Sequence, residues 1–126
     1  MQPIDVVKGF LDDVAHNPKG AVPAFRRWLT EDCLWEQSGV PDQHGVEACV
    51  ALQERAMKEF GFFTFRAEHQ ALAVTGDLVL NERVDHLVDE AGRGIGISIK
   101  VMSSFRVRGD QISKWLDVFN PGDVRK

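Results

Sequence analysis

Three charged residues in the second half of the chain have the types and spacing of an acid/base site: Arg83, Asp85 and Asp117. The two stretches that carry them read as β-strands. Successive side chains of a strand point to opposite faces, so Arg83 and Asp85 share one face. Asp117 shares a face with Trp115 and Phe119, and large apolar side chains usually point inward. A buried carboxylate needs a cation or hydrogen bonds to replace its hydration. Arg83 could be that cation, with Asp85 as the second member of an acid/base pair.

A solvated strand face is the alternative explanation for an Arg-x-Asp sequence, and its surface ion pair would stabilise the fold very little. Two features favour an internal site instead. Leu87 continues the face of Arg83 and Asp85, so this face is at least partly apolar, and aromatic residues lie on both sides of Asp117. We therefore interpret the three charged residues as a candidate site.

Length and composition are those of one soluble globular domain spanning residues 1–126. Hydrophobic residues make up 44% of the chain and charged residues 27%, which are ordinary values. The net charge of −4 and the scattered Lys and Arg argue against a nucleic-acid partner. No apolar run is long enough to span a membrane. The first residues lack the basic and apolar regions of a signal peptide, so we expect a cytoplasmic protein.

The cysteines and histidines do not have the spacing of a metal site. Cys33 and Cys49 form no CxxC pair, which predicts two free, buried thiols. The histidines are dispersed, without an HxH or HExxH arrangement: His16, His44, His69 and His86. His86 adjoins Asp85 but points to the opposite face of its strand. The chain also lacks a dinucleotide-binding or phosphate-binding glycine loop, so we expect neither a metal nor a cofactor.

Helical periodicity dominates the first half of the chain. Apolar spacing predicts helices over residues 3–16, 21–29 and 46–60. Residues 32–37 read as a brief strand, and the Gly and Pro content of residues 39–42 predicts a loop.

The second half of the chain has the period of β-strands. Strands are predicted over residues 62–74, 78–88, 95–107 and 111–119, separated by short turns. In the third of them the apolar residues share one face: Ile97, Ile99, Val101, Phe105 and Val107. Helices followed by an antiparallel meander indicate an α+β fold, in which about three N-terminal helices cover one side of a curved, mainly antiparallel sheet.

A sheet that curves around helices leaves a cone-shaped cavity. We expect apolar side chains to line it, namely Leu87, Ile97, Ile99, Val101, Trp115 and Phe119. Arg83, Asp85 and Asp117 would be its few polar groups. A mostly apolar cavity with a few converging polar groups is typical of a small-molecule site. A filled hydrophobic core is the alternative explanation for the same apolar residues.

The segments 81–85 and 109–120 resemble the limonene-1,2-epoxide hydrolase family, which has the nuclear transport factor 2-like (SnoaL-like, cystatin-like) fold. The similarity in layout extends from the first helix to Asn120. It implies a cofactor-free hydrolase in which Asp117 is the base on water, Asp85 is the acid that protonates the epoxide oxygen, and Arg83 bridges the two. It also implies a small apolar substrate and a homodimer.

The first strand departs from the pattern of that family. The family holds its catalytic water with a tyrosine and an asparagine, and here Trp35 and Gln37 occupy these positions. An indole N–H can only donate a hydrogen bond, whereas a phenol can also accept one. We expect the following residues to bind substrate or water: Trp35, Gln37, Leu87, Ile99, Val101, Trp115 and Phe119.

Two other functions are compatible with the same fold. One is a ketosteroid isomerase- or polyketide cyclase-like enzyme, in which a single carboxylate moves a proton next to a carbonyl group. The other is a non-catalytic module that binds a small molecule or a partner. The arginine between two aspartates favours the hydrolase, because a single-carboxylate proton transfer does not need that bridge.

Overall fold

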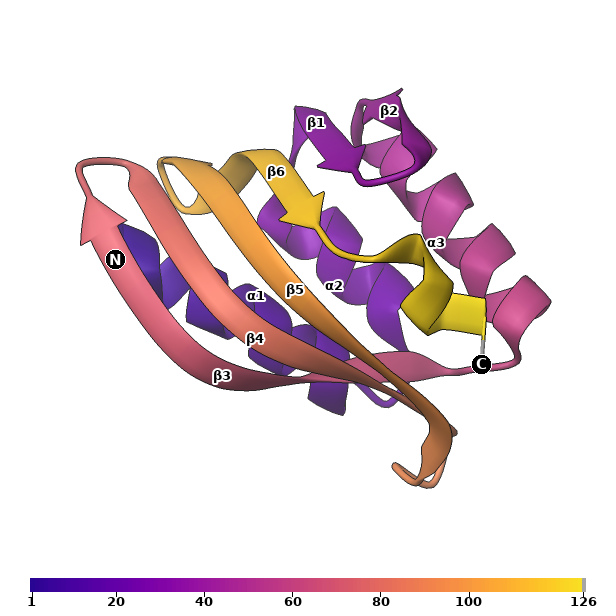
Figure 1. The fold of residues 1–126 in the computed structure, drawn as a ribbon. Helices are drawn as coiled ribbons and strands as arrows, with labels where there is room; N and C mark the ends of the chain where they lie inside the picture. Colours follow the sequence, from indigo (N-terminus) through magenta and orange to yellow (C-terminus); the bar gives the residue numbers. More distant parts are fainter. Residues whose placement is uncertain (126) are drawn as a thin grey trace.

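A curved six-stranded sheet wraps around three helices in the computed structural model of the protein, which describes residues 1–125 (Figure 1). The elements follow in the order α1 (Pro3–His16), α2 (Ala21–Trp28), β1 (Leu29–Gln37), β2 (Val40–His44), α3 (Val46–Phe60), β3 (Thr64–Thr75), β4 (Leu78–Val88), β5 (Gly94–Arg108), β6 (Gln111–Val118) and the 3₁₀ turn η1 (Pro121–Arg125). The predicted α+β fold class is confirmed.

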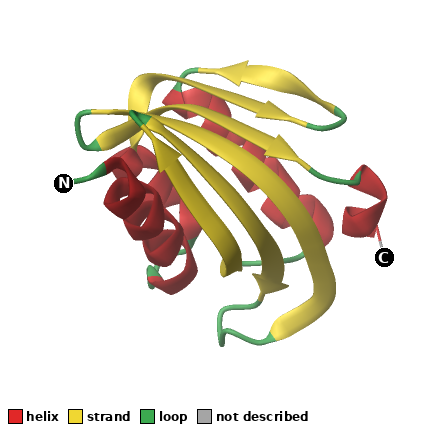
Figure 2. Cartoon of the chain, turned by 60° about the vertical axis from the view of Figure 1, so that its left-hand side comes forward, coloured by secondary structure: helices red, strands yellow, loops and turns green. Residues whose placement is uncertain are grey.

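The sheet has the strand order β2-β1-β6-β5-β4-β3. Strands β3 to β6 form the predicted antiparallel meander, and β1 joins it by pairing in parallel with β6. All three helices lie on the concave side of the sheet (Figure 2). Because β6 lies between β1 and β5, a residue of β6 has neighbours from both ends of the sequence.

The loop predicted over residues 39–42 is confirmed only at Gly39, because residues 40–42 begin the edge strand β2. A tight turn at Ser38 and Gly39 reverses the chain, and β2 then pairs antiparallel with β1. Pro41 suggested a loop because proline cannot donate to a strand ladder. An edge strand tolerates it, since one side of such a strand has no partner. Strand β1 also begins earlier than predicted, at Leu29, directly after α2.

An aromatic cluster joins the helices to the centre of the sheet. The indoles of Trp35 and Trp115 stack with ring centroids 4.2 Å apart and an interplanar angle of 9°. Phe10 from α1 and Phe25 from α2 pack edge-on against these rings, at centroid distances of 5.2 to 5.6 Å. Such contacts add to the free energy gained by burying the rings. The cluster therefore fixes β1 and β6 beside each other on the inner side of the sheet.

The convex face of the sheet carries exposed apolar side chains. Leu80, Met102 and Val118 are large and exposed, and Met102 lies directly opposite Val118 in the β5–β6 pairing. The homodimer expected from the sequence stays a prediction. None of the helices within residues 1–125 is both long and apolar enough to cross a membrane.

Gly9 in α1 is expected to resist a substitution that normally stabilises helices. A Cβ atom there would lie 2.6 Å from Cη2 of Trp28, whose Nε1 donates to Asp13 Oδ2 at 3.0 Å and so holds the ring in place. Gly9→Ala should therefore lower the free energy of unfolding by about 1–3 kcal/mol, as overpacking does, instead of raising it by about 0.5–1 kcal/mol. Urea unfolding measures the change. The same substitution in a Trp28→Leu background is the control, and a stabilising Gly9→Ala in the wild-type background would contradict this account of the packing.

Candidate active site

The buried side chain of Arg83 lies at the centre of the candidate site. The residue is 1% exposed. Its Nε and Nη2 donate to the two carboxylate oxygens of Asp85 at 2.8 and 3.2 Å. Nη2 also donates to Asp117 Oδ1 at 3.2 Å. Nη1 donates to Ser103 Oγ at 2.6 Å and to Asn81 Oδ1 at 3.3 Å. Each of the five N–H groups of the guanidinium therefore has an acceptor.

The register of the sheet brings these groups together. Asn81, Arg83 and Asp85 are alternate residues of β4 and face the concave side, as their spacing predicts. Ser103 of β5 lies opposite Asn81 on one side and opposite Asp117 of β6 on the other. The three strands thus form a row of polar groups beside Arg83, and the guanidinium spans it.

Asp117 accepts hydrogen bonds from four side chains. Its Oδ1 accepts from Arg83 Nη2, from Trp115 Nε1 at 2.7 Å and from the hydroxyl of Ser103. Its Oδ2 accepts from Trp35 Nε1 at 3.3 Å. Every one of these partners donates, so the surroundings of Asp117 suit a carboxylate anion. Oδ2, with only one donor, is the oxygen that can still accept a hydrogen bond from a molecule in the cavity.

Asp85 has a much poorer set of partners. Arg83 is its one side-chain donor among the described residues, through the two-point contact given above. Burial raises the pKa of Asp85 above its ordinary value of 3.8, the positive charge of Arg83 opposes the shift, and the negative charge of Asp117 adds to it. The two aspartates therefore differ: Asp117 accepts hydrogen bonds from four side chains, whereas Asp85 has one donor and a raised pKa.

Both carboxylates open onto a cavity of about 360 Å³. The seven residues expected to bind substrate or water all line it: Trp35, Gln37, Leu87, Ile99, Val101, Trp115 and Phe119. Ile97, which we expected to line the cavity too, is instead packed into the hydrophobic core. Arg83 lies behind the two aspartates, with its side chain fully buried and outside the cavity lining. It can therefore act on a bound molecule only through them.

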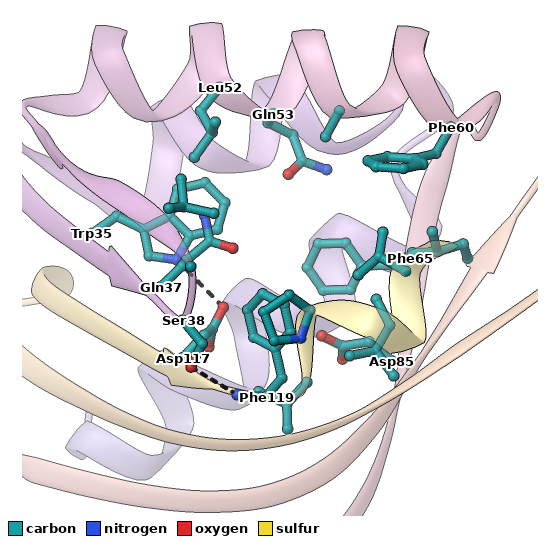
Figure 3. A pocket seen from close by; sticks show the side chains of 18 of the residues that line it. Trp35, Gln37, Ser38, Leu52, Gln53, Phe60, Phe65, Asp85, Asp117 and Phe119 are labelled. Atoms are coloured by element: carbon teal, nitrogen blue, oxygen red, sulfur yellow. Dashed lines mark hydrogen bonds between the residues drawn. The ribbon is translucent and has the colours of Figure 1, made fainter. Parts of the chain in front are cut away.

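One wall of the cavity comes from parts of the chain that the sequence analysis did not assign to the site. Helix α3 contributes Leu52, Gln53, Ala56 and Phe60, and η1 contributes Pro121 and Val124. In Figure 3, α3 runs along the side of the cavity opposite Asp85 and Asp117. Ser103 was also missed as a partner of Arg83. Its inward position could have been recognised, because it lies between Val101 and Phe105 on the apolar face of β5.

Trp35 and Gln37 lie on β1 beside Asp117, as parallel pairing of β1 with β6 requires. Gln37 is directly opposite Asp117 in this pairing, and Trp35 is opposite Trp115. The one N–H of the Trp35 indole donates to Asp117 Oδ2, so it has no further proton to offer to a water molecule. Of the two residues, Gln37 is the one with an amide still able to hold water.

The histidines and cysteines of residues 1–125 lie outside the cavity lining. His86 is on the convex face, where its ring contacts Ser98 and Glu68 at 2.8 Å each. Cys33 and Cys49 are free and buried, as predicted, and the interaction with the Cys49 thiol, followed by burial, raises the pKa of Cys33. Within residues 1–125, no three His, Cys, Asp or Glu side chains are grouped so that they could hold a metal ion.

Comparison with known families and structures agrees with this architecture. Residues 7–115 match the family model of the SnoaL-like domain. The chain therefore belongs to the SnoaL-like family, whose members have the nuclear transport factor 2-like fold. A comparison with curated protein sequences gives no significant match.

Several solved structures share the fold. An LEH-like epoxide hydrolase from M. tuberculosis is 23% identical, with a TM-score of 0.73, and the alignment covers 98% of this chain and 86% of that one. A putative polyketide cyclase from Sinorhizobium meliloti is 21% identical, with a TM-score of 0.69 and coverage of 93% and 99%. A putative SnoaL-like polyketide cyclase from Jannaschia sp. CCS1 is 14% identical, with a TM-score of 0.74 and coverage of 98% and 88%. At these identities the likeness establishes the fold alone.

Removing the Ser103 hydroxyl should destabilise the protein. Ser103→Ala deletes an acceptor of Arg83 and a donor to Asp117, both buried, and leaves Arg83 Nη1 with Asn81 as its single acceptor. We expect the free energy of unfolding to fall by about 1–3 kcal/mol. Ser104→Ala is the matched control, because Ser104 points to the other face, and it should change stability by less than about 0.5 kcal/mol. If urea unfolding showed the same loss of stability for Ser103→Ala and Ser104→Ala, the hydrogen-bond network around Ser103 would be contradicted.

The raised pKa of Asp85 predicts how stability depends on pH. Between 3.8 and the higher pKa of the folded protein, the native state binds more protons than the unfolded state. The contribution of this group to the free energy of unfolding therefore falls as pH rises through that window, with a slope of at most about 1.4 kcal/mol per pH unit. The Asp85→Asn variant does not lose this contribution. The free energy of unfolding of the variant, relative to that of the wild type, should therefore increase as the pH rises above about 4. Urea unfolding of both proteins over a pH series measures it, and a relative stability that decreases with pH would show that Arg83 lowers the Asp85 pKa instead.

Proposed function

We propose that this protein is a cofactor-free epoxide hydrolase that adds water to a small apolar epoxide in one step. The observation that carries the proposal is the pair of aspartates on one buried arginine, with unequal hydrogen-bond partners and a shared, mostly apolar cavity. Two carboxylates whose surroundings favour opposite protonation states are the usual arrangement for combined acid and base catalysis. The hydration of an epoxide needs an acid for the ring oxygen and a base for the water in the same step.

In the proposed mechanism, Asp117 is the base and Asp85 is the acid. Asp117 removes a proton from a water molecule held between its Oδ2 and the amide of Gln37. The water oxygen then forms a bond to one ring carbon as the bond from that carbon to the ring oxygen breaks. Asp85 gives its proton to the departing oxygen, which yields a diol with both new O–H groups accounted for. Solvent exchange afterwards returns the proton from Asp117 to Asp85.

Arg83 keeps the net charge of the site nearly constant during this exchange. Before the reaction one aspartate is charged, and after it the other is, so that a single guanidinium compensates a single negative charge throughout. Arg83 touches both carboxylates and needs no movement to serve either. This matches the preorganised electrostatics by which enzymes lower the energy of a transition state.

The neighbours of the same fold support the proposal only in part. One of them is described as an epoxide hydrolase, and others are described as polyketide cyclases. Cyclase- or isomerase-like chemistry therefore remains the second candidate for this cavity. It would use one carboxylate and leave the Arg83 bridge without a catalytic purpose, which is why we place hydrolysis first.

A covalent route through an aspartyl ester is less suited to this site. Hydrolysis of such an ester needs a second base, often a histidine, to activate water. No histidine of the described residues lines the cavity, and His86 is on the other face of the sheet. The direct attack of water uses only groups that are present.

Isotope labelling distinguishes these mechanisms. A panel of terpene, styrene and cycloalkene oxides incubated with the protein in ¹⁸O-labelled water should yield a singly labelled diol, and a single turnover should leave no label in the protein. Mass spectrometry of the diol and of the peptide that contains Asp117 measures both. Label in the Asp117 carboxylate would contradict direct attack by water, and the absence of diol from every epoxide would contradict the proposed function.

The roles of the two aspartates are tested by Asp85→Asn and Asp117→Asn, each of which should lower kcat by about 10²-fold or more while the protein stays folded. Glu82→Gln is the control, because Glu82 is exposed on the convex face between two inward residues of β4. It should leave kcat unchanged. Turnover that survives Asp85→Asn but not Asp117→Asn would point to chemistry with a single carboxylate, as in an isomerase.

A further inference from the structure

A polar residue interrupts the buried face of α3. The buried residues of this helix are Cys49, Val50 and Gln53. Gln53 is only 5% exposed, yet it is an amide among residues that are otherwise apolar. In Figure 3 its side chain extends from α3 into the cavity, on the side across from Asp85 and Asp117.

The side-chain amide of Gln53 has an unused hydrogen-bond donor. Its Nε2 is buried and has no hydrogen-bond partner among the described residues. Native proteins rarely leave a buried N–H group unpaired, because the group loses its hydration and gains nothing in return. On α3 the cavity lining around it includes the apolar Leu52, Ala56 and Phe60 as well as Glu59, and none of these residues accepts a hydrogen bond from Nε2. A molecule in the cavity could supply the missing acceptor.

The two sides of the cavity differ in what they can offer a ligand. On the sheet side, every N–H of Arg83 and the indole N–H groups of Trp35 and Trp115 are already used within the protein, and the amide of Gln37 lies beside Asp117, where the proposed mechanism uses it to hold water. On the helix side, the amide of Gln53 is free. A molecule that fills the space between them meets reactive carboxylates at one end and a hydrogen-bond donor at the other.

We propose that Gln53 binds a hydrogen-bond acceptor at the end of the substrate remote from the reacting ring. The substrate class is then an apolar epoxide that carries a second oxygen atom, such as a ketone, ether or hydroxyl oxygen, rather than a pure hydrocarbon epoxide. This proposal rests on the proposed function for the identity of the reacting group, but the contact to Gln53 does not. The cavity, at about 360 Å³, is at the lower end of the range for small-ligand pockets, so the two oxygens belong to one small molecule.

The contact is tested first with ligands that cannot react. Cyclic ketones of increasing ring size are compared with their exocyclic-methylene analogues, in which CH₂ replaces the carbonyl oxygen at nearly the same shape. Quenching of tryptophan fluorescence measures binding, since Trp35 and Trp115 line the cavity. The wild-type protein should prefer the ketone, and Gln53→Met should reduce that preference by roughly five- to tenfold, as expected for one net hydrogen bond.

Three controls make the result decisive. Gln70→Leu removes an exposed glutamine of β3 and should leave the preference unchanged. Any ketone preference that survives in Gln53→Met measures donation from the sheet side, by Asp85 or Gln37, so the difference between the two proteins isolates Gln53. The infrared carbonyl band of the bound ketone should lie at lower frequency in wild type than in Gln53→Met, which a purely structural role of Gln53 would not produce.

The second arm uses epoxides with and without a remote ketone. If the protein is a hydrolase, Gln53→Met should lower kcat/KM for the ketone-bearing epoxide and leave the methylene analogue nearly unaffected. Ketone selectivity in binding without any hydrolysis would overturn the proposed function but keep the Gln53 contact. The same ketone-to-methylene ratio in wild type and Gln53→Met, or no ketone binding up to the solubility limit, would overturn the proposal and leave Gln53 as a residue that binds only water. Gln53→Leu serves as a second variant should Gln53→Met not fold.

Discussion

The burial of the Arg83 guanidinium is the constraint on which the site depends. A buried cation is costly unless its charge and its N–H groups are compensated, and here the compensation comes from three strands at once. Asp85 and Asn81 belong to β4, Ser103 to β5 and Asp117 to β6. The strands must therefore keep their register to within one residue, because a slip of one residue would turn all these side chains to the convex face. The geometry of the two carboxylates follows from the same requirement.

The unequal surroundings of the two aspartates are a consequence of where their strands lie. Asp117 is on β6, between β1 and β5, so donors reach it from Trp35 on one side and Ser103 on the other. Asp85 lies nearer the edge of the meander and has Arg83 alone. Strand order thus gives Asp117 four side-chain donors and leaves Asp85 with one. The aromatic stack of Trp35 on Trp115 strengthens this difference, because it positions both indole N–H groups toward Asp117.

The sequence predicted the helices, the meander and the inward faces of Arg83, Asp85 and Asp117, because strand alternation and helical spacing are local patterns. It did not predict β2, since Gly39 and Pro41 are typical of loops and the pairing with β1 is a tertiary feature. Ser103 and Gln53 were missed for a related reason. A polar residue in an amphipathic element is normally assigned to solvent. Strand alternation places Ser103 on the inward face, but its contacts to Arg83 and Asp117, like the burial of Gln53, are tertiary features. The missed residues are the ones that complete or extend the polar network.

Chemistry and selectivity belong to different walls of this cavity. The sheet wall supplies Asp85 and Asp117 on a support in which every N–H of Arg83 is hydrogen-bonded. The helix wall contributes Gln53 and the apolar side chains around it, none of which holds the reacting groups in place. Residues of α3 can therefore change without disturbing Arg83, so that one sheet can serve many substrates. Under the proposed function, selectivity for the substrate would therefore be set mainly by residues of α3, and the acid and base by the sheet.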